Sequence, residues 1–93
     1  MEQENWISIE QCCVVYNIER SFVLKLDEHG LIELIRSNET IFITFEQLSD
    51  LEKYMHLHYE LEINMEGLET IKHLLDRVHD LQKELNRLKG EAG

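Results

Sequence analysis

Apolar residues recur at alternating steps of three and four along the C-terminal third of the chain. They are Ile71, Leu74, Val78, Leu81, Leu85 and Leu88. This spacing is the heptad pattern of a coiled coil, in which two positions of each heptad form one narrow apolar stripe along a helix. It predicts a helix over residues 65–89, which Asn64 can cap. We call these six residues the seam. One helix cannot bury such a stripe, so the chain must adopt a fold in which something covers it.

Two arrangements could cover the seam. Near Leu68 and Leu75 the apolar stripe is wider, which predicts that the base of the helix packs on the rest of the chain. Farther out, the seam could fold back on its own domain or pair with a second copy. The other expected helices are too short to cover it, which favours a homodimer. Ile and Val at one heptad position with Leu at the other suit a parallel pair, but the direction of pairing stays open.

Two short helices joined by a tight turn are predicted within residues 9–32, after a loose or extended lead-in over residues 1–7. Ser8 can cap the first, which ends near Tyr16, and Asn17 can then take the left-handed backbone conformation that a turn needs. The second ends near Glu28, and Gly30 is a natural residue to follow a helix end. This is the layout of a helix-turn-helix, a motif that commonly reads DNA.

A small β-hairpin is predicted next, because two segments rich in β-branched and aromatic residues, LIELIR and TIFITF, flank the polar break SNE. In a winged helix this hairpin is the wing. Thr44 and Gln47 can then cap a third helix that runs to about Leu61. The predicted fold is mainly α with a small β-hairpin wing. A winged helix-turn-helix core spans residues 1–63, and the long helix spans residues 64–93.

The charge of the chain disfavours nucleic acid as a partner. The 93 residues include 19 acidic and 9 basic side chains, a formal net charge of −10. The halves 1–44 and 45–93 each carry five more acids than bases, so the acidity is spread along the chain. Binding to phosphates normally relies on clustered Lys and Arg, and an acidic field repels DNA. A basic protein surface is a better match, although net acidity also serves solubility alone.

No familiar catalytic pattern occurs in the sequence, so neither an enzyme nor a cofactor is expected. Cys12 and Cys13 are adjacent, and a bridge between neighbours is strained, so we expect them to pack as small apolar side chains. His56 and His58 are two residues apart and point to different sides of a helix. We therefore expect no metal site, with His58 at the edge of the packed face.

The predicted location is the cytoplasm. No segment approaches the 18 consecutive apolar residues typical of a transmembrane helix. The N-terminal residues MEQENWISIE are acidic and lack the basic and apolar regions of a signal peptide.

The order of helix-turn-helix, wing, helix, corner and long heptad helix resembles the MerR family, most clearly over residues 9–32. The stretch LHYELEINMEGLETI, residues 57–71, is similar to the matching part of CbpM-type chaperone modulators, which are small MerR-like proteins of bacteria. The resemblance covers residues 7–88.

The second helix departs from the MerR pattern. The motif there is like S-x-R-T-L-R-Y-Y, whose arginines and tyrosine meet DNA. Here Ser21 and Leu24 occupy the two arginine positions. The basic residues left for a DNA-binding role are Arg20 and Lys25 on the helix and Arg36 in the wing. That supply is thin for a specific site, which usually needs several phosphate contacts and base-reading side chains.

The same helix gains apolar and acidic residues. Phe22 and Leu24 fall where MerR proteins present their DNA-binding face, with Asp27 and Glu28 as an acidic rim. An apolar patch with such a rim suits a protein partner, so these four residues are the candidate partner-binding site. Alternatively, Phe22 or Leu24 tucks under the wing or against the last helix.

The resemblance to CbpM-type proteins implies the kind of partner. Such proteins bind the J-domain of a DnaJ-like co-chaperone (CbpA) and restrain its work with the chaperone DnaK. J-domains present a basic helix to DnaK, and an acidic surface could compete for that helix. The predicted function is regulation of a J-domain co-chaperone. The alternative is a MerR-type transcription regulator that binds DNA.

Overall fold

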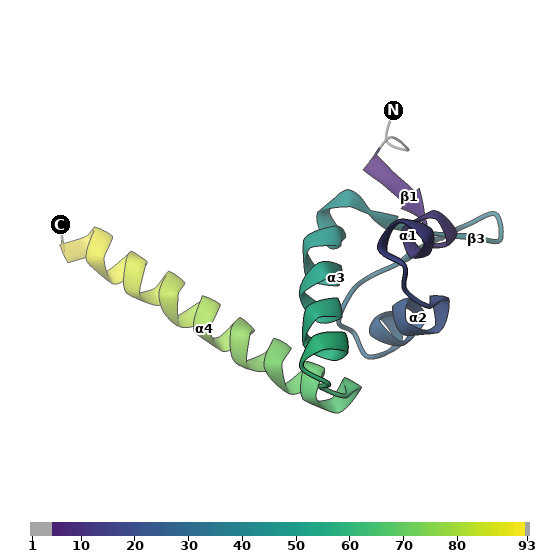
Figure 1. Ribbon diagram of the computed structural model, residues 1–93. Coiled ribbons are helices and arrows are strands. Elements are labelled where there is room, and N and C mark those ends of the chain that lie inside the picture. The colour runs from purple at the N-terminus through teal and green to yellow at the C-terminus, as the bar shows by residue number, and fades with distance from the viewer. Residues whose placement is uncertain (1–4, 93) are drawn as a thin grey trace.

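One long helix projects from a cluster of short elements, as Figure 1 shows. The structure is a computed structural model that describes residues 5–92. In chain order the elements are β1 (Trp6–Ser8), α1 (Ile9–Tyr16), α2 (Arg20–Glu28), β2 (Ile35–Ser37), β3 (Thr40–Thr44), the 3₁₀-helix η2 (Phe45–Gln47), α3 (Leu48–Met55), the π-helix η3 (His56–Glu60) and α4 (Met65–Ala92). The mainly α fold with a wing and a long final helix is therefore confirmed.

The helix-turn-helix forms as its local sequence predicts. The Ser8 hydroxyl caps α1 by accepting a hydrogen bond from the Gln11 N–H at 3.1 Å. Asn17 ends α1 in the left-handed conformation, with φ 57° and ψ 52°, which turns the chain toward α2. Gly30 follows α2 with φ 73°, a conformation that costs glycine little. These residues set α1 and α2 against each other.

The wing belongs to a three-stranded antiparallel sheet with the strand order β1-β3-β2. The hairpin of β2 and β3 turns through Asn38 and Glu39, which both have positive φ. On its other side β3 pairs with β1, and Ile7 lies opposite Ile43. The sequence predicted only a loose or extended lead-in there. Three residues are too short to signal a strand until their partner is known.

Two details of the predicted wing and third helix are wrong. Leu31 and Ile32 are not in a strand, because they are buried in the core at the bend before β2. Thr44 does not cap a helix, because it is the last residue of β3 and makes no side-chain cap hydrogen bond. Gln47 is used elsewhere, since its side-chain oxygen accepts a hydrogen bond from the Glu33 N–H at 3.1 Å.

The core lies where the short helices, the sheet and the base of α4 meet. Its buried members are Ile9, Cys12, Phe22, Val23, Leu26, Leu31, Ile32, Ile43, Leu51, Tyr54 and Leu68. The expected packing role of Cys12 is confirmed, and burial, followed by the nearby Cys13, raises the pKa of the Cys12 thiol to about 11. Cys12 and Cys13 are both free. The same burial keeps the Cys12 thiol protonated and unreactive near neutral pH.

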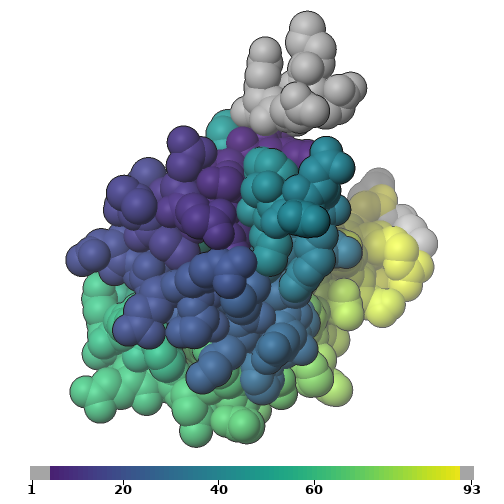
Figure 2. All heavy atoms as spheres, turned by 90° about the vertical axis from the view of Figure 1, so that its right-hand side faces the viewer, coloured from purple at the N-terminus to yellow at the C-terminus, as the bar shows by residue number. Residues whose placement is uncertain are grey.

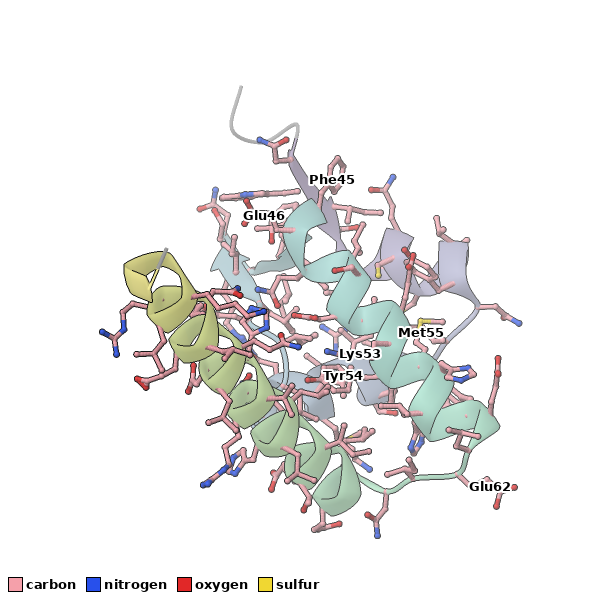
Figure 3. All side chains as sticks on the ribbon, turned by 90° about the vertical axis from the view of Figure 1, so that its left-hand side faces the viewer. Phe45, Glu46, Lys53, Tyr54, Met55 and Glu62 are labelled. Atoms are coloured by element: carbon pink, nitrogen blue, oxygen red, sulfur yellow. The ribbon has the colours of Figure 1, made fainter. Side chains whose placement is uncertain are left out.

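The third helix changes pitch before it ends. After α3, residues His56–Glu60 form one π-helical turn, and Glu62 ends the segment with φ 58°. The half-buried His58 lies at the edge of the packed face, as predicted, and its Nδ1 is 2.8 Å from the Ile63 carbonyl oxygen. Figure 3 shows α3 beside α4, with Tyr54 and Lys53 on the side of α3 toward α4. The π-turn and the corner thus bring α4 back against the domain.

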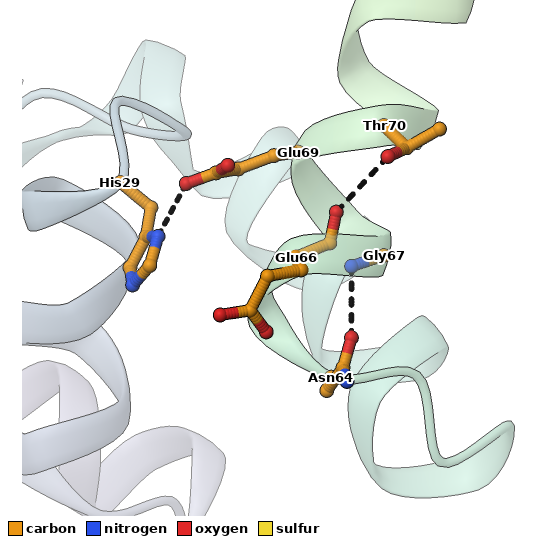
Figure 4. A network of polar contacts seen from close by, with 6 residues as sticks. All are labelled: His29, Asn64, Glu66, Gly67, Glu69 and Thr70. Carbon is orange, nitrogen blue, oxygen red and sulfur yellow. Dashed lines mark hydrogen bonds and ion pairs between the residues drawn. The ribbon is translucent and has the colours of Figure 1, made fainter.

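Two side-chain contacts, which Figure 4 shows, and one buried leucine fasten the base of α4. The Asn64 side chain caps the helix by accepting a hydrogen bond from the Gly67 N–H at 2.8 Å, as predicted. His29, at the end of α2, pairs with Glu69. Leu68 is fully buried in the core. A β-carbon on Gly67 would lie 2.5 Å from a methyl carbon of Ile63, so the first turn and the corner approach too closely for a side chain there.

Beyond its base, α4 is exposed on all sides. The seam residues from Leu74 to Leu88 are each 48–63% exposed, whereas Ile71 is half-buried. In the single chain the seam therefore does not fold back on its own domain. The long axis of the molecule, 51 Å, reflects this projection.

Candidate protein-interaction surface around α2

Phe22 is part of the core rather than of an exposed patch. It is only 4% exposed, beside the fully buried Val23 and Leu26, so the prediction that it is an exposed apolar contact for a partner is wrong. Its ring stacks on His58, with centroids 4.9 Å apart, and tilts against Tyr59 at 5.0 Å. The alternative prediction, that Phe22 packs inside the fold, agrees better with the structure. The residues that cover Phe22 come from η3 rather than from the wing or α4.

The other three candidate residues differ in how free they are. Leu24 is half-buried and packs against the core. Asp27 holds the wing, because it accepts a hydrogen bond from the Leu34 N–H at 3.3 Å and lies 3.7 Å from the Arg36 guanidinium. Glu28 is exposed and has no ion pair with any residue from 5 to 92. Of the four, only Glu28 is fully available to a partner.

The cations of the winged helix are mostly neutralised within the chain. Arg20 is paired with Glu10 at 3.1 Å, and Arg36 with Asp27. On α3, Lys53 is 3.4 Å from Asp50. Within the described part of the chain, Lys25 alone among the three predicted DNA-binding residues has no ion pair. Paired cations offer less net charge to phosphates, so this surface is poorly suited to DNA.

A groove of about 470 Å³ separates α2 from the corner that leads into α4. It is lined by Glu19, Ser21, Phe22, Lys25, Glu28, His29, His58, Tyr59, Asn64, Met65 and Glu66. We call it the α2 groove. In Figure 2, α2 (blue) meets the η3–α4 corner (green) on the face toward the viewer. Three carboxylates and one ammonium line the groove, so its charge is negative.

Aromatic rings form one wall of the α2 groove. Tyr59 is 48% exposed, and its ring meets the His58 ring edge-on at 4.9 Å. Burial, followed by the nearby charge of Glu19, raises the pKa of Tyr59, so its hydroxyl stays protonated at neutral pH. The wall therefore offers an aromatic face and a hydroxyl beside the carboxylates.

Sequence reasoning missed Glu19, Tyr59 and Glu66 as members of this surface. Glu66 reaches α2 only because the corner folds back, and nothing in the local sequence predicts that approach. No sequence signal singles out Tyr59 either, because single exposed aromatic residues are common on protein surfaces.

The described residues offer no other obvious chemistry. Among residues 5–92, no group of three His, Cys, Asp or Glu side chains is placed to hold a metal ion. In the same part of the chain, no helix has the length and apolar character required to cross a membrane.

The fold and this surface define a winged helix-turn-helix protein in which Ser21 and Leu24 stand at the two arginine positions of a DNA-reading helix and three carboxylates line the adjoining groove. The chain belongs to the MerR family of helix-turn-helix regulatory proteins, whose profile matches residues 7–90. It is similar to the chaperone modulatory protein CbpM of Pseudomonas entomophila, with 27% identity over 88 residues, 94% of this chain and 87% of that protein. The expected resemblance to CbpM-type proteins within the MerR-like superfamily is confirmed. No solved structure shows a significant match.

Proposed function

We propose that this protein binds the J-domain of a DnaJ-like (CbpA-type) co-chaperone and restrains its work with DnaK. The single observation that supports this most strongly is the negative α2 groove at the position of the DNA-reading helix. The similarity to a chaperone modulatory protein points the same way. A basic helix is complementary to such a surface, and charge complementarity supplies specificity and a fast association rate. The proposed place of action is the cytoplasm.

The four predicted partner-binding residues have different roles in this proposal. Glu28 is the proposed direct contact, and the exposed part of Leu24 lies one turn away on α2. Asp27 acts indirectly by holding the wing, and Phe22 acts from beneath by supporting Tyr59.

We also propose that the seam pairs with the seam of a second copy. Five of its residues are about half exposed on one stripe of a projecting helix, and a heptad stripe fits a second identical stripe. A pair of molecules would then present two α2 grooves.

The alternative function, DNA binding as a MerR-type regulator, has the family fold in its favour. Its phosphate contacts would fall to Lys25, together with Arg20 and Arg36 once they are released from Glu10 and Asp27. Breaking these two ion pairs costs free energy, so DNA binding is the weaker of the two proposals.

A competition experiment tests the proposed function. A fixed amount of J-domain is bound to DnaK, and this protein is added in increasing amounts. We expect the fraction of J-domain bound to DnaK to fall. An unchanged fraction at micromolar excess and low salt, where attraction between charges is strongest, would contradict it.

A further inference from the structure

Tyr59 lies where two grooves meet. It lines the α2 groove and also a second groove of about 300 Å³, formed by Tyr16, Asn17, Ile18, Glu52, Met55, His56, Tyr59 and Glu60. We call the second one the turn groove. Tyr59 is the one residue that the two linings share. A partner that lies along the boundary between the helix-turn-helix and the α3–η3 segment would therefore have to cross the Tyr59 ring.

The ring of Tyr59 is held in place from behind. It packs on Phe22 and on His58, which stack on each other. A carbonyl oxygen only accepts hydrogen bonds, so the 2.8 Å contact to Ile63 requires the proton on His58 Nδ1. The π-turn that carries His58 and Tyr59 is a rare geometry often found at functional sites. A side chain supported in this way loses little freedom when a partner binds.

Acceptors outnumber donors around this ring. The carboxylates of Glu19, Glu28 and Glu66 line the α2 groove, and none has an ion pair with a residue from 5 to 92. Lys25 is the cation that opposes them.

We propose that the α2 groove receives a lysine or arginine side chain from a helix of the partner, with the cation on the face of Tyr59. A cation over an aromatic ring is attracted by its negative face, and here carboxylates flank the ring. On the far side of Tyr59 the turn groove offers apolar contacts from Ile18 and Met55. The occupant is therefore an amphipathic helix that offers a basic residue to the α2 groove and an apolar residue to the turn groove. This assignment rests on the proposed function and names the contact through which it acts.

Variants of Tyr59 test the proposed cation contact. Tyr59→Leu removes the ring at an exposed position, so we expect J-domain affinity to fall about ten-fold. Tyr59→Phe keeps the ring and should stay within about three-fold of the wild type. Equal losses in both variants would point to the hydroxyl and overturn the cation site. Thermal unfolding of each variant shows whether it remains folded.

A matched pair of charge variants tests whether the site is local. Glu28→Gln with Glu66→Gln removes two carboxylates from the groove. Glu46→Gln with Asp80→Asn removes the same net charge from exposed positions on η2 and α4 that do not line it. We expect the first pair to lower J-domain affinity at least about ten-fold more than the second. Equal losses would overturn the groove while leaving the proposed function standing, whereas no binding by the wild type would overturn both.

Discussion

α2 and the outer half of α4 both face solvent, but they leave opposite kinds of surface without a partner. α2 buries its apolar residues Val23 and Leu26 and exposes a negative groove. The outer half of α4 exposes apolar residues such as Leu81 and Leu85. Attraction between charges weakens with salt and gives fast, reversible binding, whereas apolar burial is nearly insensitive to moderate salt. The difference suggests that α2 meets an exchanging partner and α4 meets a permanent one.

The largest expected effect is on α4. Leu81→Asp places a carboxylate in each half of the paired seam, where an unpaired charge is costly. We expect the dissociation constant of the dimer to rise about 10,000-fold, measured by sedimentation equilibrium. Lys83→Gln, at an outward heptad position of the same turn, is the control and should change it little. A dimer that survives Leu81→Asp would show that the seam is not the interface.

The base of α4 should respond through folding rather than through pairing. Leu68 is fully buried, whereas Leu74 is 57% exposed. Leu68→Ala should lower the free energy of unfolding by about 2–5 kcal/mol, because it removes packed atoms and leaves a cavity. Leu74→Ala should lower the free energy of unfolding far less. Urea unfolding measures both variants at protein concentrations low enough to keep the chain monomeric. Equal costs would mean that the base and the outer half of α4 are not distinct.

Alkaline pH should destabilise the domain and spare the seam. Burial raises the pKa of Tyr54 to about 12, and a hydrogen bond to Glu52 raises that of Tyr16 to about 12. A tyrosine whose pKa is higher in the folded state than in the unfolded state contributes its full stability below pH 10, the pKa in the unfolded state. That contribution is lost as the pH rises toward 12, the pKa in the folded state. Tyr54 alone should contribute a loss of about 1–2 kcal/mol by pH 11, because one pKa unit corresponds to about 1.4 kcal/mol. Urea unfolding from pH 8 to 11 measures the loss, and Tyr54→Phe should flatten the curve.

The smallest effects concern the two helical glycines of α4. Gly67 is in close contact with Ile63, whereas nothing lies within 4 Å of a β-carbon on Gly90. Gly67→Ala should lower the free energy of unfolding by about 1 kcal/mol or more, since the corner must shift. Gly90→Ala should leave it unchanged or raise it by up to about 1 kcal/mol. Thermal unfolding of both variants measures the contrast, and a stabilising Gly67→Ala would contradict the tight corner.

Local sequence signals predicted most of the fold. The α1 cap at Ser8, the left-handed Asn17 and the α4 cap at Asn64 all depend on side chains within a few residues. The interactions that form them involve only neighbouring residues, so they can be predicted from the sequence. β1 was not predicted as a strand, because a strand of three residues is defined by its partner, and that partner is more than 30 residues away.

The candidate site was only partly predictable for the same reason. The exposure of Glu28 near the end of α2 agrees with the sequence prediction. The burial of Phe22 does not, because it depends on the π-turn that brings His58 and Tyr59 over it. Asp27 looked like an exposed acid until the wing supplied Leu34 and Arg36 as its partners.

The central claim is that a fold typical of DNA-binding proteins here binds a basic protein partner. The most direct test is whether removal of the Lys25 charge strengthens or weakens binding. Lys25 is the cation that opposes the acids of the α2 groove and the most available residue for a phosphate. Lys25→Gln and the wild type are titrated with a J-domain and with duplex DNA at low and near-physiological salt. We expect Lys25→Gln to bind the J-domain about two- to five-fold more tightly than the wild type does. Binding of the J-domain by both proteins should weaken as salt rises, and neither should bind DNA tightly. Nanomolar binding of the wild type to a duplex near physiological salt, lost in Lys25→Gln, would contradict it.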